Sequence, residues 1–161
     1  MLAIEQAGKR IATTGITSEA DDIAHEDNRR GEESPFLAEA LIVVIGEAQS
    51  GIALTKRAIT TYFESEFDKL HLANVCSSLD AVRGSMEIIG EDRLAFCIQS
   101  CTNCIQEVLL DKEERPDDKL LETLADILTS LEYYIESLSV HEKPNPELLT
   151  LTEESLKSIG F

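Results

Sequence analysis

The sequence contains no tryptophan, and aromatic residues make up only 5% of its 161 positions. Basic residues are also scarce: 14 Lys and Arg stand against 31 Asp and Glu, which gives a formal net charge of -17. Such a charge repels phosphate backbones and anionic membrane surfaces, so we expect no nucleic-acid binding. The N-terminus lacks a signal-peptide layout, and no run approaches 18 apolar residues. We therefore expect a cytoplasmic protein without membrane insertion.

Proline is rare as well, with four residues that all lie at apparent helix boundaries, and no stretch shows the alternation typical of strands. These absences favour an all-α fold. Residues 1–34 are weakly patterned and are predicted to be a linker or a partial helix, with a short helix at 3–12 and a polar linker at 19–34. Ser34 is expected to cap the helix that Pro35 begins. Residues 35–161 are predicted to form one helical domain.

Apolar residues recur at helical spacing through this domain. They predict four long helices and one short C-terminal helix, at residues 35–65, 68–89, 93–111, 116–139 and 147–158. Short loops between long helices favour an antiparallel up-down four-helix bundle. The second helix is expected to end at Gly90, a residue suited to a C-cap.

The stretch D-A-V-R-G-S-M-E-I-I-G, Asp80 to Gly90, carries the most distinctive polar pattern. On a helix, Asp80, Arg83, Gly84 and Glu87 share one face, opposite an apolar stripe. A glycine inside a helix costs about 1 kcal/mol relative to alanine, and it commonly marks a place where something comes close to the backbone. The alternative without a functional role is a solvated helix face with a weak Asp80–Arg83 ion pair.

This stretch resembles the motif of histidine phosphotransfer (Hpt) domains, His-x-x-Lys-Gly-x-x-x-x-x-Gly. Arg83 stands at the lysine, Gly84 and Gly90 match the two glycines, and Asp80 replaces the phosphoacceptor histidine. The resemblance implies an Hpt-like bundle with a face that docks a receiver domain. A carboxylate does not offer the exposed imidazole nitrogen of the relay reaction. We therefore predict no catalytic residue here and a partner-docking role for Asp80, Arg83, Gly84 and Glu87.

Three further stretches resemble one Hpt-like module of the large chemotaxis-type hybrid histidine kinases that control type IV pili and twitching motility. They are G-E-A-Q-S-G-I-A-L-T-K-R-A-I, L-A-D-I-L-T-S-L-E-Y-Y-I-E-S-L and L-T-E-E-S-L-K-S-I-G-F, which begin at Gly46, Leu124 and Leu151. The resemblance implies a parent histidine kinase, with a receiver domain or sister Hpt-like modules as partners. No nucleotide-binding box occurs in this chain, so the segment itself is not expected to be an enzyme.

Three cysteines, Cys97, Cys101 and Cys104, have the C-x3-C-x2-C spacing that radical SAM enzymes use for an iron–sulfur cluster. The same spacing is also the core stripe of a helix, in which cysteine behaves as a small apolar residue. Because the chain shows no strands for an α/β barrel, we expect these thiols, reduced, in the core, and neither a metal nor another cofactor. Cys76 is expected near the edge of that core.

None of the three histidines, His25, His71 and His141, precedes a Lys-Gly or Arg-Gly pair, so we expect ordinary surface side chains. The sequence thus predicts a non-catalytic pseudo-Hpt interaction or scaffold module in phosphorelay signalling. Three alternatives remain open. They are a phosphotransfer module with an unrecognised acceptor, a cysteine-metal or redox protein, and a free-standing helical adaptor.

Overall fold

A computed structural model describes residues 35–139 and 143–161. The predicted helix at 3–12, the linker, the Ser34 cap, His25 and His141 lie outside these residues. The chain divides into two units, Met1–Ala40 and Leu41–Phe161, and only residues 35–40 of the first are described. The described residues are all-helical and include no strand, as expected from the sequence.

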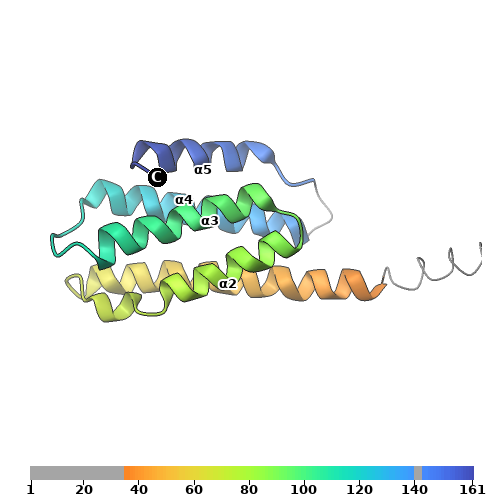
Figure 1. Ribbon diagram of the computed structural model, residues 1–161, viewed down its shortest axis with the longest axis horizontal. Helices are drawn as coiled ribbons and strands as arrows, with labels where there is room; N and C mark the ends of the chain where they lie inside the picture. The colour runs from red at the N-terminus through yellow and green to blue at the C-terminus, as the bar shows by residue number, and fades with distance from the viewer. Residues whose placement is uncertain (1–34, 140–142) are drawn as a thin grey trace, which may run out of the picture. The chain divides into compact units, whose positions relative to one another are not determined.

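Figure 1 shows the helices in chain order. The first helix is described over Pro35–Glu64. A 3-10 turn, η1, and four α-helices, α2 to α5, follow, and α3 continues into a π-helical segment, η2. Their bounds are η1 Lys69–Leu72, α2 Val75–Ile88, α3 Asp92–Cys104, η2 Ile105–Leu110, α4 Asp118–Ser139 and α5 Pro146–Ser158.

The start of α2 was predicted wrongly. The sequence placed it near Asp68, whereas α2 begins at Val75 and a separate turn, η1, precedes it. Glu66 and Phe67 have positive φ angles of 59° and 72°, which stop the first helix and reverse the chain. The Asp68 carboxylate then accepts a hydrogen bond from the Leu70 amide at 3.0 Å and caps the short turn.

The end of α2 follows the prediction. Gly90 has a φ of +83°, and the Glu91 amide donates to the Met86 carbonyl at 2.9 Å. This backbone pattern closes a helix and favours glycine at the left-handed position. The start of α4 needs a small correction. The sequence predicted that this helix begins at Pro116, whereas it begins two residues later, at Asp118, and Pro116 is a buried residue of the preceding loop.

Within Leu41–Phe161, the helices pack around one apolar core. Helix α2 packs on α3, and α5 packs on both α3 and α4 (Figure 1). The first helix meets α2 where Gly51 faces Val82, and it meets α4 through an ion pair of 2.6 Å between Lys56 and Glu132. Every helix contributes buried residues, such as Ile52, Leu79, Ile98, Leu128 and Leu156.

One described helix, Pro35–Glu64, is long and apolar enough to cross a membrane by length and composition alone. Its most apolar 18-residue window has a mean hydropathy of 1.6, and 17% of that window is buried. The same helix supplies Ile45, Ile52 and Ile59 to the core. The expectation that the chain does not insert into a membrane stays a prediction.

Candidate docking site

The predicted site residues share one exposed side of α2, as the helical spacing requires. Leu79, Val82 and Met86 turn into the core and hold the helix in place. The polar residues between them therefore point outward. We call Asp80, Arg83, Gly84 and Glu87 the charged face.

Arg83 lies at the centre of the charged face and pairs with both carboxylates. Its Nη1 atom donates to Oε1 of Glu87 at 2.6 Å, and its Nε atom lies 3.8 Å from Oδ1 of Asp80. About half of each carboxylate side chain is exposed, against 30% for Arg83. Nε itself is buried and has no hydrogen-bond partner among the described residues. The two carboxylates thus orient a guanidinium at the surface.

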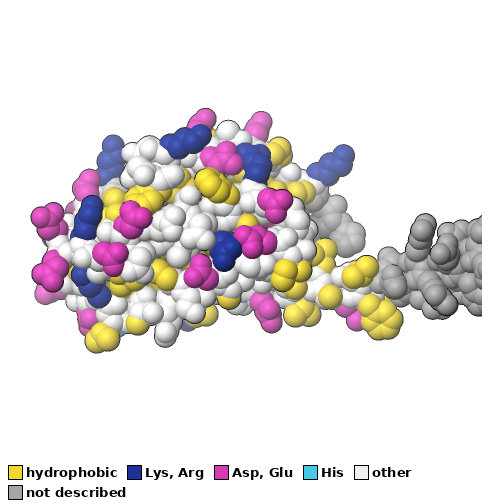
Figure 2. Space-filling model, viewed as in Figure 1, with side chains coloured by type: hydrophobic (Ala, Val, Ile, Leu, Met, Phe, Trp, Pro, Cys, Tyr) yellow, Lys and Arg dark blue, Asp and Glu magenta, His cyan; other side chains and the backbone are white. Residues whose placement is uncertain are grey.

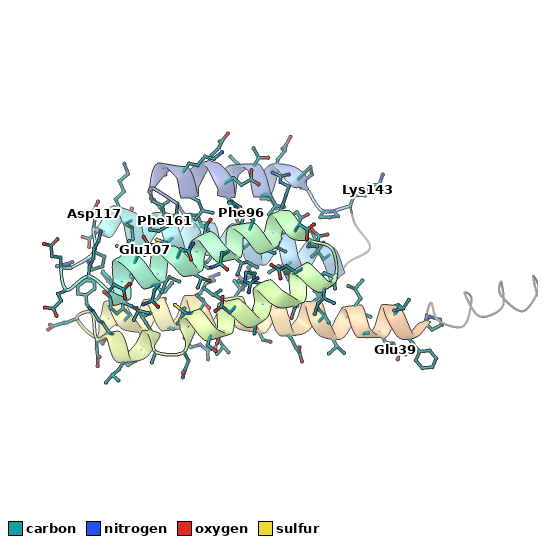
Figure 3. All side chains as sticks on the ribbon, viewed as in Figure 1. Glu39, Phe96, Glu107, Asp117, Lys143 and Phe161 are labelled. Atoms are coloured by element: carbon teal, nitrogen blue, oxygen red, sulfur yellow. The ribbon has the colours of Figure 1, made fainter. Side chains whose placement is uncertain are left out.

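A shallow hollow adjoins the charged face and brings in residues of α3. It has a volume of about 270 Å³ and is lined by Arg83, Glu87, Asp92, Ala95, Phe96 and Gln99. Phe96, labelled in Figure 3, leaves 66% of its surface exposed. Figure 2 shows acidic and basic side chains side by side over α2 and α3. The site therefore combines an aromatic ring with opposite charges, and of these residue types the aromatic and the arginine are enriched at protein contacts.

Gly84 leaves open space on the charged face. A Cβ atom built at this position would meet no heavy atom within 4 Å. Packing inside the domain therefore does not require a glycine here, although a helix glycine costs about 1 kcal/mol relative to alanine. Gly51 shows the contrasting case, because its Cβ would lie 2.4 Å from Cγ2 of Val82. A glycine at position 84 would instead allow a molecule from outside the domain to come close to the α2 backbone.

The charged face consists of three charged side chains and one glycine. Among the described residues, no group of three or more His, Cys, Asp or Glu side chains is arranged to hold a metal ion. Phosphorylation of an aspartate in receiver domains uses a metal held by an acidic pocket. Asp80 faces Arg83 on an exposed helix, without such a pocket. His71 is exposed and lies apart from this arrangement, before α2 begins.

The predicted burial of three cysteines is confirmed, because Cys97, Cys101 and Cys104 have no exposed surface and line the core. Burial raises the pKa of Cys97 and of Cys104 to about 11, and it raises the pKa of Cys101 as well. Cys76 is half-buried, and burial together with Asp80 and Asp111 raises the pKa of its thiol. None of the four is therefore an activated thiolate.

Sequence reasoning grouped the α2 residues of the candidate site and did not include the α3 residues that line the same hollow. Phe96 and Asp92 join it only because α3 packs on α2, a contact between separate helices. A signal for Phe96 was present. Phe96 does not lie on the apolar helix face formed by Leu94, Ile98 and Cys101. Helical spacing therefore predicts that its aromatic ring faces outward.

Comparison with known proteins identifies the family. The family model described as the FimL C-terminal domain matches residues 35–156. A Pseudomonas aeruginosa protein named scaffold protein FimL is 50% identical over 126 residues, which cover 78% of this chain. The chain spans 22% of the length of that relative. No solved structure matches the chain with statistical significance. The chain belongs to the FimL C-terminal domain family.

Proposed function

We propose that this chain is a non-catalytic scaffold module with a pseudo-Hpt fold, whose charged face docks a receiver domain of a response regulator. Sister Hpt-like modules are a second class of partner for the same face. The name of the relative, scaffold protein FimL, supports the scaffold role. The four long helices support an Hpt-like bundle, in which α5 is the additional C-terminal helix.

The observation that carries the docking role is the open position at Gly84. A half-buried helix glycine whose Cβ would meet no neighbour inside the domain leaves room for a partner backbone. Arg83, paired with Asp80 and Glu87, supplies a guanidinium next to that gap. Arginine and aromatic residues are enriched at protein interfaces, and Phe96 lies in the adjoining hollow.

Replacement of the relay histidine by Asp80 supports binding without phosphoryl transfer. The partner is held by the surface around the acceptor position, while the acceptor itself is absent. We place the module in cytoplasmic signalling that controls type IV pili and twitching motility, as the sequence resemblance implies. The parent kinase expected from the sequence stays a prediction, and the name of the relative favours a scaffold parent.

Phosphoryl transfer from a phosphorylated receiver domain tests this proposal. The wild-type chain and an Asp80→His variant are incubated with a receiver domain that carries radiolabelled phosphate. We expect no label on the wild type and acid-labile label on Asp80→His, because the docking geometry is retained and only the acceptor is restored. An Asp80→His, Arg83→Ala double variant controls for transfer that does not need the charged face.

Two other outcomes would contradict the proposal. Label on the wild type would contradict the non-catalytic role and would favour an unrecognised acceptor. Absence of label on both proteins, together with no binding of the receiver in calorimetry, would show that this chain does not dock a receiver domain. In that case the free-standing helical adaptor would be the better description.

A further inference from the structure

A second surface of α2 has a different chemistry from the charged face. A groove of about 460 Å³ runs between the first helix and α2. Its walls are small or apolar side chains, including Gly46, Ser50, Leu54, Ser78, Ala81 and Ser85, and we call it the neutral groove. An adjoining hollow of about 380 Å³ shares Leu54 and Ser78 and extends to Leu70.

The dimensions of the neutral groove fit a helix. Its first-helix wall, with the adjoining hollow, runs from Val43 to Ala58, a length of about 22 Å at 1.5 Å per residue. That length matches about four turns of a partner helix. Leu54 and Leu70 leave 55% and 79% of their surfaces exposed along it. Apolar side chains exposed beside small ones are typical of grooves that accept an amphipathic helix.

Gly46 gives an independent indication. A Cβ atom at Gly46 would meet nothing within 4 Å, so packing inside the described domain does not explain this helix glycine. It lies on the wall of the neutral groove, where the absence of a side chain lets another helix approach closely. Gly46 and Gly84 are thus two unexplained helix glycines on two different surfaces.

The charge of the chain indicates which kind of molecule could bind in the neutral groove. Glu47 is the one charged residue that lines the main groove in the described structure, so the contact stripe of the occupant is apolar. The chain as a whole carries -17, which repels a second copy of itself and an anionic membrane. The same field attracts a basic partner. The first helix also shows apolar side chains at its surface in Figure 2.

We propose that the neutral groove binds an amphipathic helix with basic flanks from a partner protein. The apolar residues of that helix, spaced at i, i+3, i+4 and i+7, lie between the first helix and α2. Its Lys and Arg residues are attracted by the net charge of -17 that the chain carries. The inference is separate from receiver docking, because the groove does not use Arg83, Gly84 or Glu87.

The test uses a fluorescein-labelled synthetic peptide of 18 residues that contains only leucine, alanine and lysine and places leucine on one helical face. A scrambled peptide of equal charge is the control for non-specific attraction. Binding to the whole chain is measured by fluorescence anisotropy. Gly46→Leu fills the groove, and Gly84→Leu is the matched substitution outside it, since both positions have open space for a side chain.

We expect the amphipathic peptide to bind and the scrambled peptide to bind about tenfold more weakly or worse. Gly46→Leu is expected to weaken binding about tenfold, and Gly84→Leu to leave it within about twofold. Ser85→Leu, on the opposite wall, should repeat the effect of Gly46→Leu. Equal binding of both peptides, or unchanged binding by both groove variants, would overturn the proposal. A wild-type dimer in sedimentation that Gly46→Leu dissociates would assign the groove to a second copy instead.

Discussion

Helices α2 and α3 are neighbours, and each carries a motif that repeats at helical spacing. The α2 motif, Asp80, Arg83 and Glu87, lies at the surface and is linked by ion pairs. The α3 motif, Cys97 and Cys101 with Cys104, lies entirely in the core. Spacing alone therefore identifies a shared helix face and leaves its environment open. The residue type decides which face is buried, because charges stay in water and thiols pack as small apolar groups.

The largest difference in the free energy of unfolding is expected when the residue types of the two motifs are exchanged. Cys101→Asp places a carboxylate where no surface is exposed, and we expect it to lower the free energy of unfolding by about 3–5 kcal/mol. Asp80→Cys removes only an exposed partner of Arg83, and we expect a change below about 0.5 kcal/mol. Urea unfolding monitored by circular dichroism measures both. Similar losses for the two variants would contradict the comparison.

Alkaline pH should lower stability through the α3 cysteines and not through the α2 charges. Cys97 and Cys104 have a pKa raised by burial to about 11, above the ordinary value of 9.0. The unfolded chain therefore loses these protons first, so stability is full below pH 9 and falls as the pH rises to 11. The loss should be on the order of 2 kcal/mol for each thiol.

Unfolding at a series of pH values checks this decline. Cys97→Ala should have a shallower decline between pH 9 and 11 than the wild type, while Asp80→Asn should keep the full decline. If Cys97→Ala retained the wild-type slope, the thiol would not be the titrating group.

Substitution of Gly51 should change the free energy of unfolding in the opposite direction to substitution of Gly46 or Gly84. Gly51→Ala brings a Cβ against the buried side chain of Val82, and we expect a net loss of about 1–2 kcal/mol in unfolding free energy. Gly84→Ala and Gly46→Ala meet no neighbour and should gain about 0.5–1 kcal/mol from helix propensity. Thermal unfolding of the three variants provides the measurement. A loss at Gly84 would mean that the folded domain needs this glycine for itself.

Removal of the central guanidinium should have the smallest effect on stability. Arg83→Ala breaks two exposed ion pairs, and we expect a loss of no more than about 0.5 kcal/mol. Urea unfolding at low and at high salt checks this value, and the small difference should shrink as salt screens the pairs. A loss above about 2 kcal/mol would show that Arg83 serves mainly to hold the fold together.

The sequence predicted the helices and the buried cysteines because both depend on local periodicity. It misplaced the start of α2, since the reversal at Glu66 and Phe67 depends on tertiary packing. The Phe67 ring packs against Tyr62 with 5.3 Å between the ring centroids and lies under Arg115, a residue distant in sequence. The π-helical segment after Cys104 also gave no local signal.

The candidate site shows the same limit. Four residues of one helix face, Asp80 to Glu87, could be grouped from their spacing alone. The hollow with Phe96, and the neutral groove beside Gly46, each need two helices to be placed against one another. Gly46 entered the sequence analysis only as the start of a resembling stretch, whereas the structure puts it on the wall of a groove.

Calorimetric titration of a receiver domain into the wild type, Gly84→Leu and Gly46→Leu tests the central claim most directly. We predict that Gly84→Leu weakens binding about tenfold or more, because its side chain fills the gap on the charged face. Gly46→Leu should bind like the wild type, since it alters only the neutral groove. Unchanged binding by Gly84→Leu, or an equal loss in both variants, would contradict docking through the charged face.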